Sequence, residues 1–284
     1  MNDLFRISAD LIAMQESIPI RFVHNRSMDR PEKHVLHINN YVEIYVYIEG
    51  DHQYIVENSL YKLKKGDIVI INPREVHKAL LNKEVLYERF YFLVDLQSFD
   101  RMHLNPLLPI LNKLDGRSNL ISFDESVRPK ILNILYGISD CFKEGKDDQL
   151  RALSLFLSLL DEIDRFLKID EPLELQAAHT PEVLKRILRY VADHTAELQS
   201  ITEISDALGF SPQYLSSYFS HQVGTPLKTY IQAKKIALAK ELLSKGADVT
   251  EACYDCGFND CSYFIKVFKK YVGATPMSYK RRVE

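Results

Sequence analysis

The chain has 284 residues, with a formal net charge of −3, 46% hydrophobic residues and 26% charged residues. This composition is typical of folded soluble proteins and excludes disordered, collagen-like and purely coiled-coil chains, while the length predicts about two domains. No run approaches the roughly 18 apolar residues of a membrane helix, and the first residues lack a basic and then apolar leader, so we expect a cytoplasmic protein without membrane contact.

The first third of the chain reads as a series of short β-strands. Residues 43–48 alternate polar and apolar side chains, and further strand-like runs follow at 52–57, 60–63, 68–71 and 86–94. Short strands at this spacing predict a jelly-roll barrel. Alternation along 43–48 places Glu43, Tyr45 and Tyr47 on one face of their strand.

A helical connector is expected next, over residues 127–143 and 147–168. In the second segment leucines recur at three- and four-residue spacing, namely Leu150, Leu153, Leu157, Leu160 and Leu167. Such a seam suits a dimer interface or an antiparallel helix pair, and equally well suits packing against the barrel of the same chain. The polar, proline-containing residues that follow, up to Pro181, predict a linker.

The C-terminal third contains an internal repeat with a period of 48 residues. A capping-box pattern begins at Ser200 and recurs at Asp248, and a Gly-Phe pair at 209–210 recurs at 257–258. Each copy therefore predicts a short capped helix, a glycine turn and a second capped helix, which is the helix-turn-helix pattern. A plain helical bundle is the alternative, but two matched copies favour DNA binding.

The second helix of each copy has a core face and an outer face. Leu215 and Phe219 lie four residues apart, as do Phe264 and Phe268, so each pair faces the core. The outer-face candidates for base contacts are Gln213, Ser216, Ser217 and Ser220 in the first copy and Cys261, Ser262 and Lys266 in the second. The candidates for phosphate contacts are Lys228, Lys234, Lys235, Lys269, Lys280, Arg281 and Arg282.

Charge and helix length agree with this interpretation. Residues 180–284 carry 14 Lys and Arg against 11 Asp and Glu, whereas residues 1–179 carry 22 against 28. A basic balance favours a phosphate backbone, although the alternative for each lysine is a solvated surface charge. A long helix beginning at Tyr230 and ending at Gly246 would hold the two copies about one DNA turn apart, ~34 Å.

Residues 182–282 resemble the AraC/XylS class of bacterial transcription regulators. The strongest similarity lies in the segment from Gly257 to Tyr279, which includes Phe264, Gly273 and Pro276. The resemblance implies a seven-helix DNA-binding domain that reads two adjacent major grooves, together with dimerisation in the helical connector and contact with RNA polymerase. Family members commonly carry Arg near position 217, so Ser217 argues against strong guanine reading by the first copy.

Residues 20–95 resemble the cupin-type sensing domain that precedes this DNA-binding domain in many family members. The similarity rests on the runs 43–50, 63–68 and 72–77. Metal-binding cupins present a His-x-His pair, a Glu and a later His, and the corresponding residues here are His37, Asn39, Glu43 and His77. Asn is a poor transition-metal ligand, so we expect no metal and no cofactor, and a small-molecule pocket instead.

The effector-binding residues expected from this resemblance are His37, Asn39, Glu43, Tyr45, Tyr47 and His77. Tyrosines beside Glu, His and Asn suit a polar ring, and many family members with this layout sense sugars. The alternative is that these tyrosines are core packing with locally satisfied hydroxyls. Cys253, Cys256 and Cys261 lack a fourth zinc ligand, and Cys253 and Cys256 are expected to pack in the core of the helical domain.

The expected fold is therefore multidomain: a cupin-like β-barrel at 1–125, a helical connector and dimerisation region at 126–168, a linker at 169–181, and an all-α domain with two helix-turn-helix motifs at 182–284. The expected function is that of a dimeric, non-enzymatic transcription regulator, an activator, that binds double-stranded DNA and responds to a carbohydrate effector. Two alternatives stay open: a metal-dependent cupin enzyme, and a dimeric DNA-binding regulator without a ligand.

Overall fold

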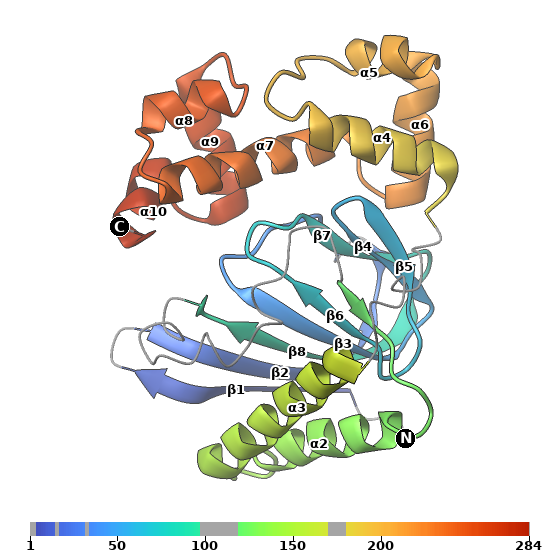
Figure 1. The fold of residues 1–284 in the computed structure, drawn as a ribbon, viewed down its shortest axis with the longest axis vertical. Coiled ribbons are helices and arrows are strands. Elements are labelled where there is room, and N and C mark those ends of the chain that lie inside the picture. The colour runs from blue at the N-terminus through green and yellow to red at the C-terminus, as the bar shows by residue number, and fades with distance from the viewer. Residues whose placement is uncertain (1–3, 15–16, 32–33, 97–118, 170–179, 284) are drawn as a thin grey trace.

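The computed structural model describes residues 4–14, 17–31, 34–96, 119–169 and 180–283, which form a sheet-rich N-terminal half and a helical C-terminal half (Figure 1). The larger of two sheets has the strand order β1-β2-β8-β3-β6-β9. Its strands are β1 (Phe5–Met14), β2 (Ser17–Asp29), β8 (Val85–Val94), β3 (Val42–Glu49), β6 (Ile68–Ile71) and β9 (Leu120–Ile121). All their pairings are antiparallel.

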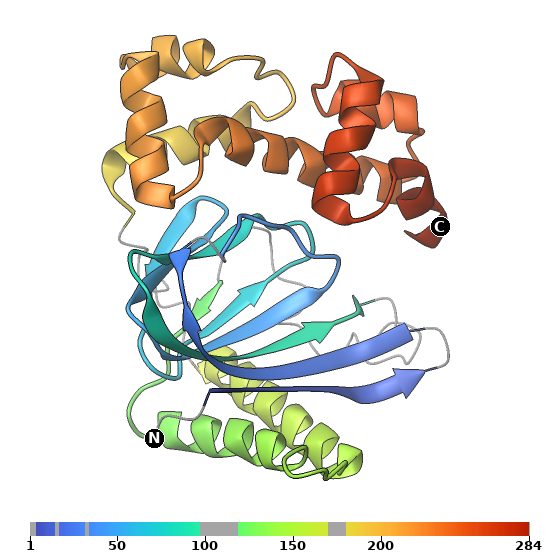
Figure 2. The ribbon, with the colours of Figure 1, turned by 180° about the vertical axis from the view of Figure 1, so that it is seen from behind.

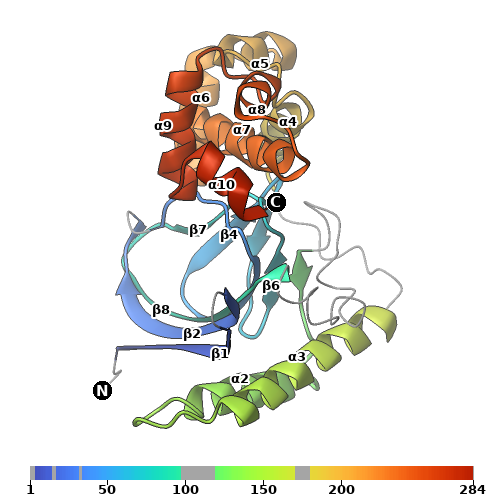
Figure 3. The same cartoon turned by 90° about the vertical axis from the view of Figure 1, so that its left-hand side faces the viewer.

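The smaller sheet has the order β5-β4-β7, formed by β5 (Ser59–Lys62), β4 (His52–Val56) and β7 (His77–Leu81). An apolar cluster joins the inner faces of the two sheets, since it contains Tyr45 and Tyr47 of the larger sheet and Tyr54 of the smaller one. An isolated bridge between His37 and His77 adds the segment before β3 to the edge of the smaller sheet. The two sheets curve around a shared interior (Figure 3).

Strand β3 shows how alternation divides the two sides of the larger sheet. Val42, Ile44 and Val46 point outward and are buried under the helices α2 (Arg128–Asp140) and α3 (Gln149–Ile169). Tyr45 and Tyr47 point to the interior between the sheets. The strand is buried on both faces because helices cover one face and the second sheet covers the other (Figure 1).

The helices α2 and α3 form an antiparallel pair against the outer face of the larger sheet (Figure 1). Phe156, Leu159 and Ile163 of α3 are fully buried there. The leucine seam predicted for this helix is divided: Leu160 joins the buried cluster, whereas Leu150 is 81% exposed and Leu157 is 46% exposed. Packing against the same chain therefore uses most of the apolar face of α3.

The helical half consists of α4 (Glu182–Asp193), α5 (Ile201–Leu208), α6 (Pro212–Val223), α7 (Leu227–Ser244), α8 (Val249–Asp255), α9 (Cys261–Val272) and α10 (Pro276–Val283). Helix α7 runs between two lobes, α4 to α6 at one end and α8 to α10 at the other (Figure 1). At about 1.5 Å per residue, its 18 residues span about 27 Å.

Most predicted elements are present, with shifted ends. The strands expected at 43–48, 52–57, 60–63, 68–71 and 86–94 correspond to β3, β4, β5, β6 and β8, and both connector helices are present. The expected linker falls largely on residues 170–179, which lie outside the described residues. Among the described residues, no helix combines the length and the apolar character needed to cross a bilayer.

Candidate functional site

The first helix pair, α5 and α6, is fixed by local capping. The Ser200 side chain accepts a hydrogen bond from the Glu203 amide, and the Glu203 carboxylate accepts one from the Ser200 backbone amide, which completes the predicted capping box. Gly209 ends α5 with φ of 74°, a left-handed conformation that suits glycine. Ser211 then caps α6, so three residues turn the chain between the two helices.

The second pair, α8 and α9, repeats this construction. Asp248 and Glu251 form the capping box of α8, and Asp260 caps α9. Gly257 lies in the turn with φ of 84°, and a Cβ atom at this position would overlap the carbonyl oxygen of Ala196. A glycine is therefore required here both by the backbone conformation and by the close approach of the segment after α4.

Helices α6 and α9 stand on the same face of the helical half (Figures 2 and 3). Their inward residues, Leu215, Phe219, Phe264 and Phe268, are fully buried. Of the base-contact candidates, Gln213, Ser217, Ser262 and Lys266 are exposed, and Ser216, Ser220 and Cys261 are partly exposed. The sequence pattern did not single out Tyr214, Tyr263 and Ile265 as outward residues, yet all three are exposed on these helices.

The phosphate candidates fall into two groups. Lys228, Lys269, Arg281 and Arg282 are exposed, and Lys280 is partly exposed with its Nζ donating to the carbonyl of Gly246 at 3.0 Å. Lys234 instead forms an ion pair with Glu57 of the N-terminal half, and Lys235 is buried with its Nζ donating to the carbonyl of Gly257. In this arrangement of the chain, the ammonium groups of Lys234 and Lys235 are both bound by other parts of the protein.

A cavity of about 580 Å³ lies in the interior of the sheet-rich half. Four of the predicted effector-binding residues line it: His37, Asn39, Glu43 and Tyr45. Tyr47 and His77 do not line it, because the Tyr47 hydroxyl turns to the carbonyl of Gly50 and His77 is buried behind Glu43.

Other lining residues were missed by the sequence analysis. They come from β1, β2, β4, β8 and the segment before β3, and include Arg6, Asn25, Asp29, His34, Tyr54, Tyr87, Arg89 and Tyr91. Strand alternation alone could have placed Tyr87, Arg89 and Tyr91 on one face, since they lie two residues apart on a predicted strand. Nothing in the sequence indicates that β1 and β2 extend the sheet to complete the cavity wall.

Arg89 is the main cationic group of the cavity. Its guanidinium lies 4.4 Å from the ring centre of Tyr87, and its Nη1 is 3.7 Å from Asp29 Oδ2. Among the described residues, this Nη1 has no hydrogen-bond partner. The Tyr45 and Tyr87 hydroxyls are 2.8 Å apart, and burial raises the pKa of Tyr87 to about 12, so both hydroxyls stay neutral. The wall thus combines a cation, a carboxylate and neutral hydroxyls.

His37, Glu43 and His77 form a tight cluster at one side of the cavity, with potential ligand atoms all within 4.8 Å of one another. His77 Nε2 is 3.5 Å from Glu43 Oε2, and the Asn39 amide donates to the same oxygen at 2.6 Å. Burial disfavours charge on His77, but the Glu43 carboxylate outweighs burial and raises the pKa of His77. Burial and the neighbouring His77 lower the pKa of His37 to about 4.

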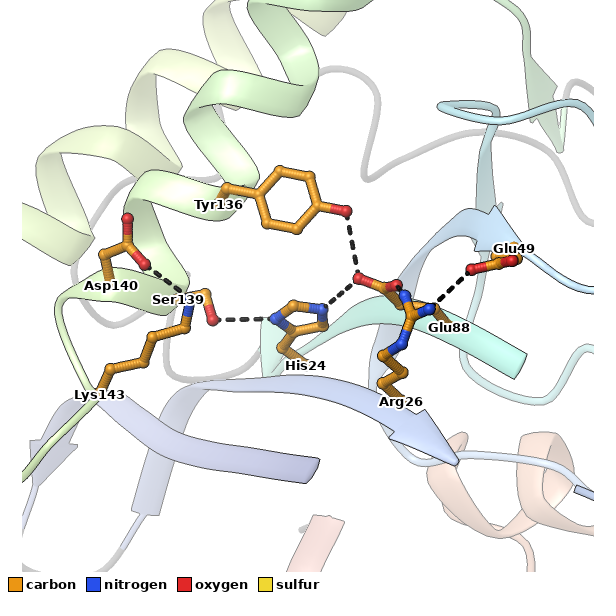
Figure 4. A network of polar contacts seen from close by, with 8 residues as sticks. All are labelled: His24, Arg26, Glu49, Glu88, Tyr136, Ser139, Asp140 and Lys143. Carbon is orange, nitrogen blue, oxygen red and sulfur yellow. Dashed lines mark hydrogen bonds and ion pairs between the residues drawn. The ribbon is translucent and has the colours of Figure 1, made fainter. Parts of the chain in front are cut away.

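A separate buried network joins the sheet to helix α2 (Figure 4). His24 Nδ1 is 2.9 Å from Ser139 Oγ, and His24 Nε2 is 2.9 Å from Glu88 Oε1, which also accepts from the Tyr136 hydroxyl. A serine, a histidine and a carboxylate are thus in line. Ser139 is fully buried, and its hydrogen bond to His24 ties α2 to the sheet.

The two halves of the chain are in direct contact. Lys78 of β7 donates to the carbonyl of Gly224 at 2.8 Å, at the C-terminal end of α6. Lys240 of α7 donates to the carbonyl of Asn39 at 2.7 Å, and Tyr230 of α7 donates to the carbonyl of Glu57. Leu36, Ile55, Leu60 and Val76 of the N-terminal half belong to the same apolar cluster as the core of the helical half.

Comparison with known proteins identifies the helical half. A helix-turn-helix domain model matches residues 204–282. The uncharacterised HTH-type transcriptional regulator YbfI of Bacillus subtilis is 26% identical over 234 residues, 79% of this chain and 80% of that protein. The arabinose operon regulatory protein of Escherichia coli is 29% identical over 229 residues, 78% of this chain and 74% of that protein.

Other matches are more distant. The chain spans 30% of the length of the Staphylococcus aureus regulator SAR0107, at 21% identity. The crystal structure of ToxT from Vibrio cholerae is 14% identical, with a TM-score of 0.38 over 93% of this chain and 98% of that one. YbfI and the arabinose operon regulatory protein, which each match most of this chain, are both named as regulators. Residues 204–282 are thus similar to a helix-turn-helix domain, and most of the chain is similar to proteins named as transcriptional regulators.

Proposed function

We propose that α5–α6 and α8–α9 are two helix-turn-helix motifs that enter adjacent major grooves of one DNA site. The observation that carries this proposal is the placement of α6 and α9 on one face, with Gln213, Ser217, Ser262 and Lys266 exposed (Figure 2). Helix α7 is about 27 Å long at about 1.5 Å per residue, which is compatible with two helices spaced by about one DNA turn. Gln reads adenine and Lys reads guanine or contacts phosphate.

The test begins with selection of binding sequences from random double-stranded DNA by the full chain. Lys266→Ala should then weaken binding to the selected site by ~1–3 kcal/mol and relax its sequence preference at one position, if Lys266 reads a base. Lys269→Ala, on the same helix, is the matched control for a phosphate contact and should weaken binding to all sequences alike. Selection without any enriched sequence would overturn the proposal.

The cavity is proposed to bind the effector, a small carbohydrate. Its combination of the Arg89 cation, the Asp29 carboxylate and tyrosine hydroxyls offers donors and acceptors for the hydroxyl groups of a sugar, and its aromatic rings offer apolar faces. The relationship to a protein named for regulation of the arabinose operon supports the same class of ligand. A cavity of about 580 Å³ is within the range of small-molecule sites.

A thermal-shift screen of the full chain against sugars tests this assignment, since a ligand that binds the folded chain raises its melting temperature. Tyr87→Phe removes a hydroxyl from the cavity wall and should reduce the shift caused by a true ligand. Tyr47→Phe is the control, because the Tyr47 hydroxyl bonds to Gly50 outside the lining. Equal effects of the two variants would contradict this placement of the ligand.

The contacts between the halves give the effector a route to the DNA-binding helices. Asn39 lines the cavity with its side chain and binds Lys240 with its carbonyl, while Lys78 holds the end of α6. An effector that binds one arrangement of the two halves more tightly than another increases the population of the first arrangement. The size of the shift is set by the difference between the two binding affinities. Regulation then consists of changing the positions in which α6 and α9 face the DNA.

The remaining proposals concern organisation. We place the sensing region at 1–125, the connector at 126–168, the linker at 169–181 and the DNA-binding domain at 182–284. A homodimer formed through the connector is consistent with the exposed Leu150 and Leu157 of α3, and two tethered readers would bind one operator more tightly than one. Activation through RNA polymerase in the cytoplasm completes the proposed role.

A further inference from the structure

The cluster of His37, Glu43 and His77 is built from three separate parts of the chain. Glu43 lies on β3, His77 begins β7, and His37 belongs to the segment before β3. The backbones of the two histidines are tied together, because each amide donates to the other carbonyl, at 3.2 and 3.1 Å. The positions of the three side chains are therefore set by sheet pairing and not by a flexible loop.

Both imidazole rings are oriented by a backbone carbonyl. Nδ1 of His37 is 2.9 Å from the carbonyl of Val35, and Nδ1 of His77 is 2.7 Å from the carbonyl of Glu75. In the neutral ring this hydrogen bond places the proton on Nδ1 and leaves the lone pair on Nε2. Histidines that bind metals are commonly held in this way, with the second nitrogen donating to a carbonyl or carboxylate.

We propose that His37, Glu43 and His77 bind one divalent transition-metal ion at the wall of the cavity. Two imidazoles and one carboxylate are the ligand set of zinc, iron(II), manganese and related ions, whereas magnesium and calcium prefer oxygen ligands alone. His37 and Glu43 line the cavity, so a bound ion has a route from solvent and a side open to the cavity. The proposal concerns metal binding and does not depend on the proposed effector.

This inference departs from the expectation drawn from the sequence. Asn39 replaces one histidine of the metal-binding cupin pattern, and for that reason the sequence predicts a small-molecule pocket here and no metal. In the structure Asn39 Nδ2 is 2.6 Å from Glu43 Oε2 and 3.5 Å from His77 Nε2, so position 39 lies beside the three proposed ligands. The site thus has three strong metal ligands, His37, Glu43 and His77, and beside them Asn39, which is a poor ligand.

The experiment uses the full chain, freed of metal with a chelator and titrated with zinc, manganese or cobalt(II) alone. We expect one ion per chain, and with cobalt(II) a visible absorption band that reports nitrogen and oxygen ligands. His37→Ala, Glu43→Gln and His77→Ala should each weaken binding at least about tenfold, a difference of about 1.4 kcal/mol. Asn39→His should tighten binding, because it adds an imidazole beside the other ligands.

His34→Ala is the matched control, since His34 lines the same cavity but lies outside the cluster, and it should leave metal affinity unchanged. Circular dichroism establishes that each variant is folded, and Glu43→Gln, which keeps the shape of the side chain, serves if an alanine variant unfolds. No binding by the parent chain, or equal binding by the His37→Ala/His77→Ala double variant, would overturn the proposal. The selection of DNA sequences tests DNA binding and does not depend on the metal titration. The proposal of metal binding and the proposal of DNA binding can therefore fail separately.

Discussion

Gly257 shows what a single residue contributes to the second helix pair. Its φ of 84° is strained for other residues, and a Cβ would also meet the Ala196 carbonyl, whereas Gly209 has φ of 74° and open space around it. Gly209→Ala should therefore lower the free energy of unfolding by about 1–2 kcal/mol, the cost of a left-handed residue. Gly257→Ala should lower it by a further ~1–3 kcal/mol for overpacking.

Urea denaturation of the two variants and the parent chain measures this difference. Gly209 and Gly257 occupy equivalent places in the repeat, so Gly209→Ala serves as the control for Gly257→Ala. Equal losses in the two variants would mean that the contact with Ala196 does not constrain the turn. A repeat period of 48 residues predicts that both glycines are needed but cannot predict which one is crowded, because Ala196 belongs to a different part of the chain.

At the level of elements, local signals predict well and long-range pairing does not. The capping boxes at Ser200 and Asp248 and the alternation of β3 follow from neighbouring residues, and the structure confirms them. Strands β1, β2, β7 and β9 were not predicted. They depend on pairing with other strands: β1 with β2, β2 also with β8, β7 with β4, and β9 with β6. The cavity residues that β1 and β2 contribute were therefore missed as well.

We expect the network around His24, which joins α2 to the sheet, to make the stability of the protein depend on pH (Figure 4). Burial lowers the pKa of His24 below its usual 6.5, although the Glu88 carboxylate acts in the opposite direction, and Arg26 and Lys143 lower it further. The unfolded chain then binds a proton at a higher pH than the folded chain does. As the pH falls through about 6.5, the ordinary value for histidine, the free energy of unfolding should therefore decrease.

His24→Gln removes this proton uptake and should flatten the dependence of stability between about pH 7 and pH 5, measured by urea denaturation at several pH values. Other buried histidines contribute to the slope of both proteins, so the informative quantity is the difference between variant and parent. Identical slopes would show that His24 titrates alike in the folded and unfolded chains.

For the whole molecule, the contact between the halves engages one of the lysines that we propose as phosphate contacts, Lys234. The sequence pattern assigned Lys234 to phosphate, but its partner Glu57 lies 177 residues away and could not be inferred from the pattern. Glu57 also accepts a hydrogen bond from the Val76 amide through its other oxygen, which Gln can retain. Glu57→Gln therefore breaks the ion pair between the halves with little change to the turn that follows β4.

We expect Glu57→Gln to raise the affinity of the full chain for its selected DNA by up to about tenfold, or about 1.4 kcal/mol, because Lys234 becomes available and the halves separate more easily. Glu241→Gln, which breaks the exposed Glu241–Lys245 pair on the same helix, is the control and should change little. Affinity is measured by titration of labelled DNA at fixed salt, since phosphate contacts depend on ionic strength.

Lys234→Met completes a double-mutant cycle with Glu57→Gln. In the Lys234→Met background, Glu57→Gln should have no further effect, because the ion pair is already broken. If Lys234 also contacts phosphate once released, Lys234→Met alone gives weaker binding than Glu57→Gln and a smaller dependence on salt. If Lys234 acts only between the halves, the two single variants bind alike. An increase in affinity from Glu57→Gln that persists without Lys234 would exclude this ion pair as the restraint on the DNA-binding half.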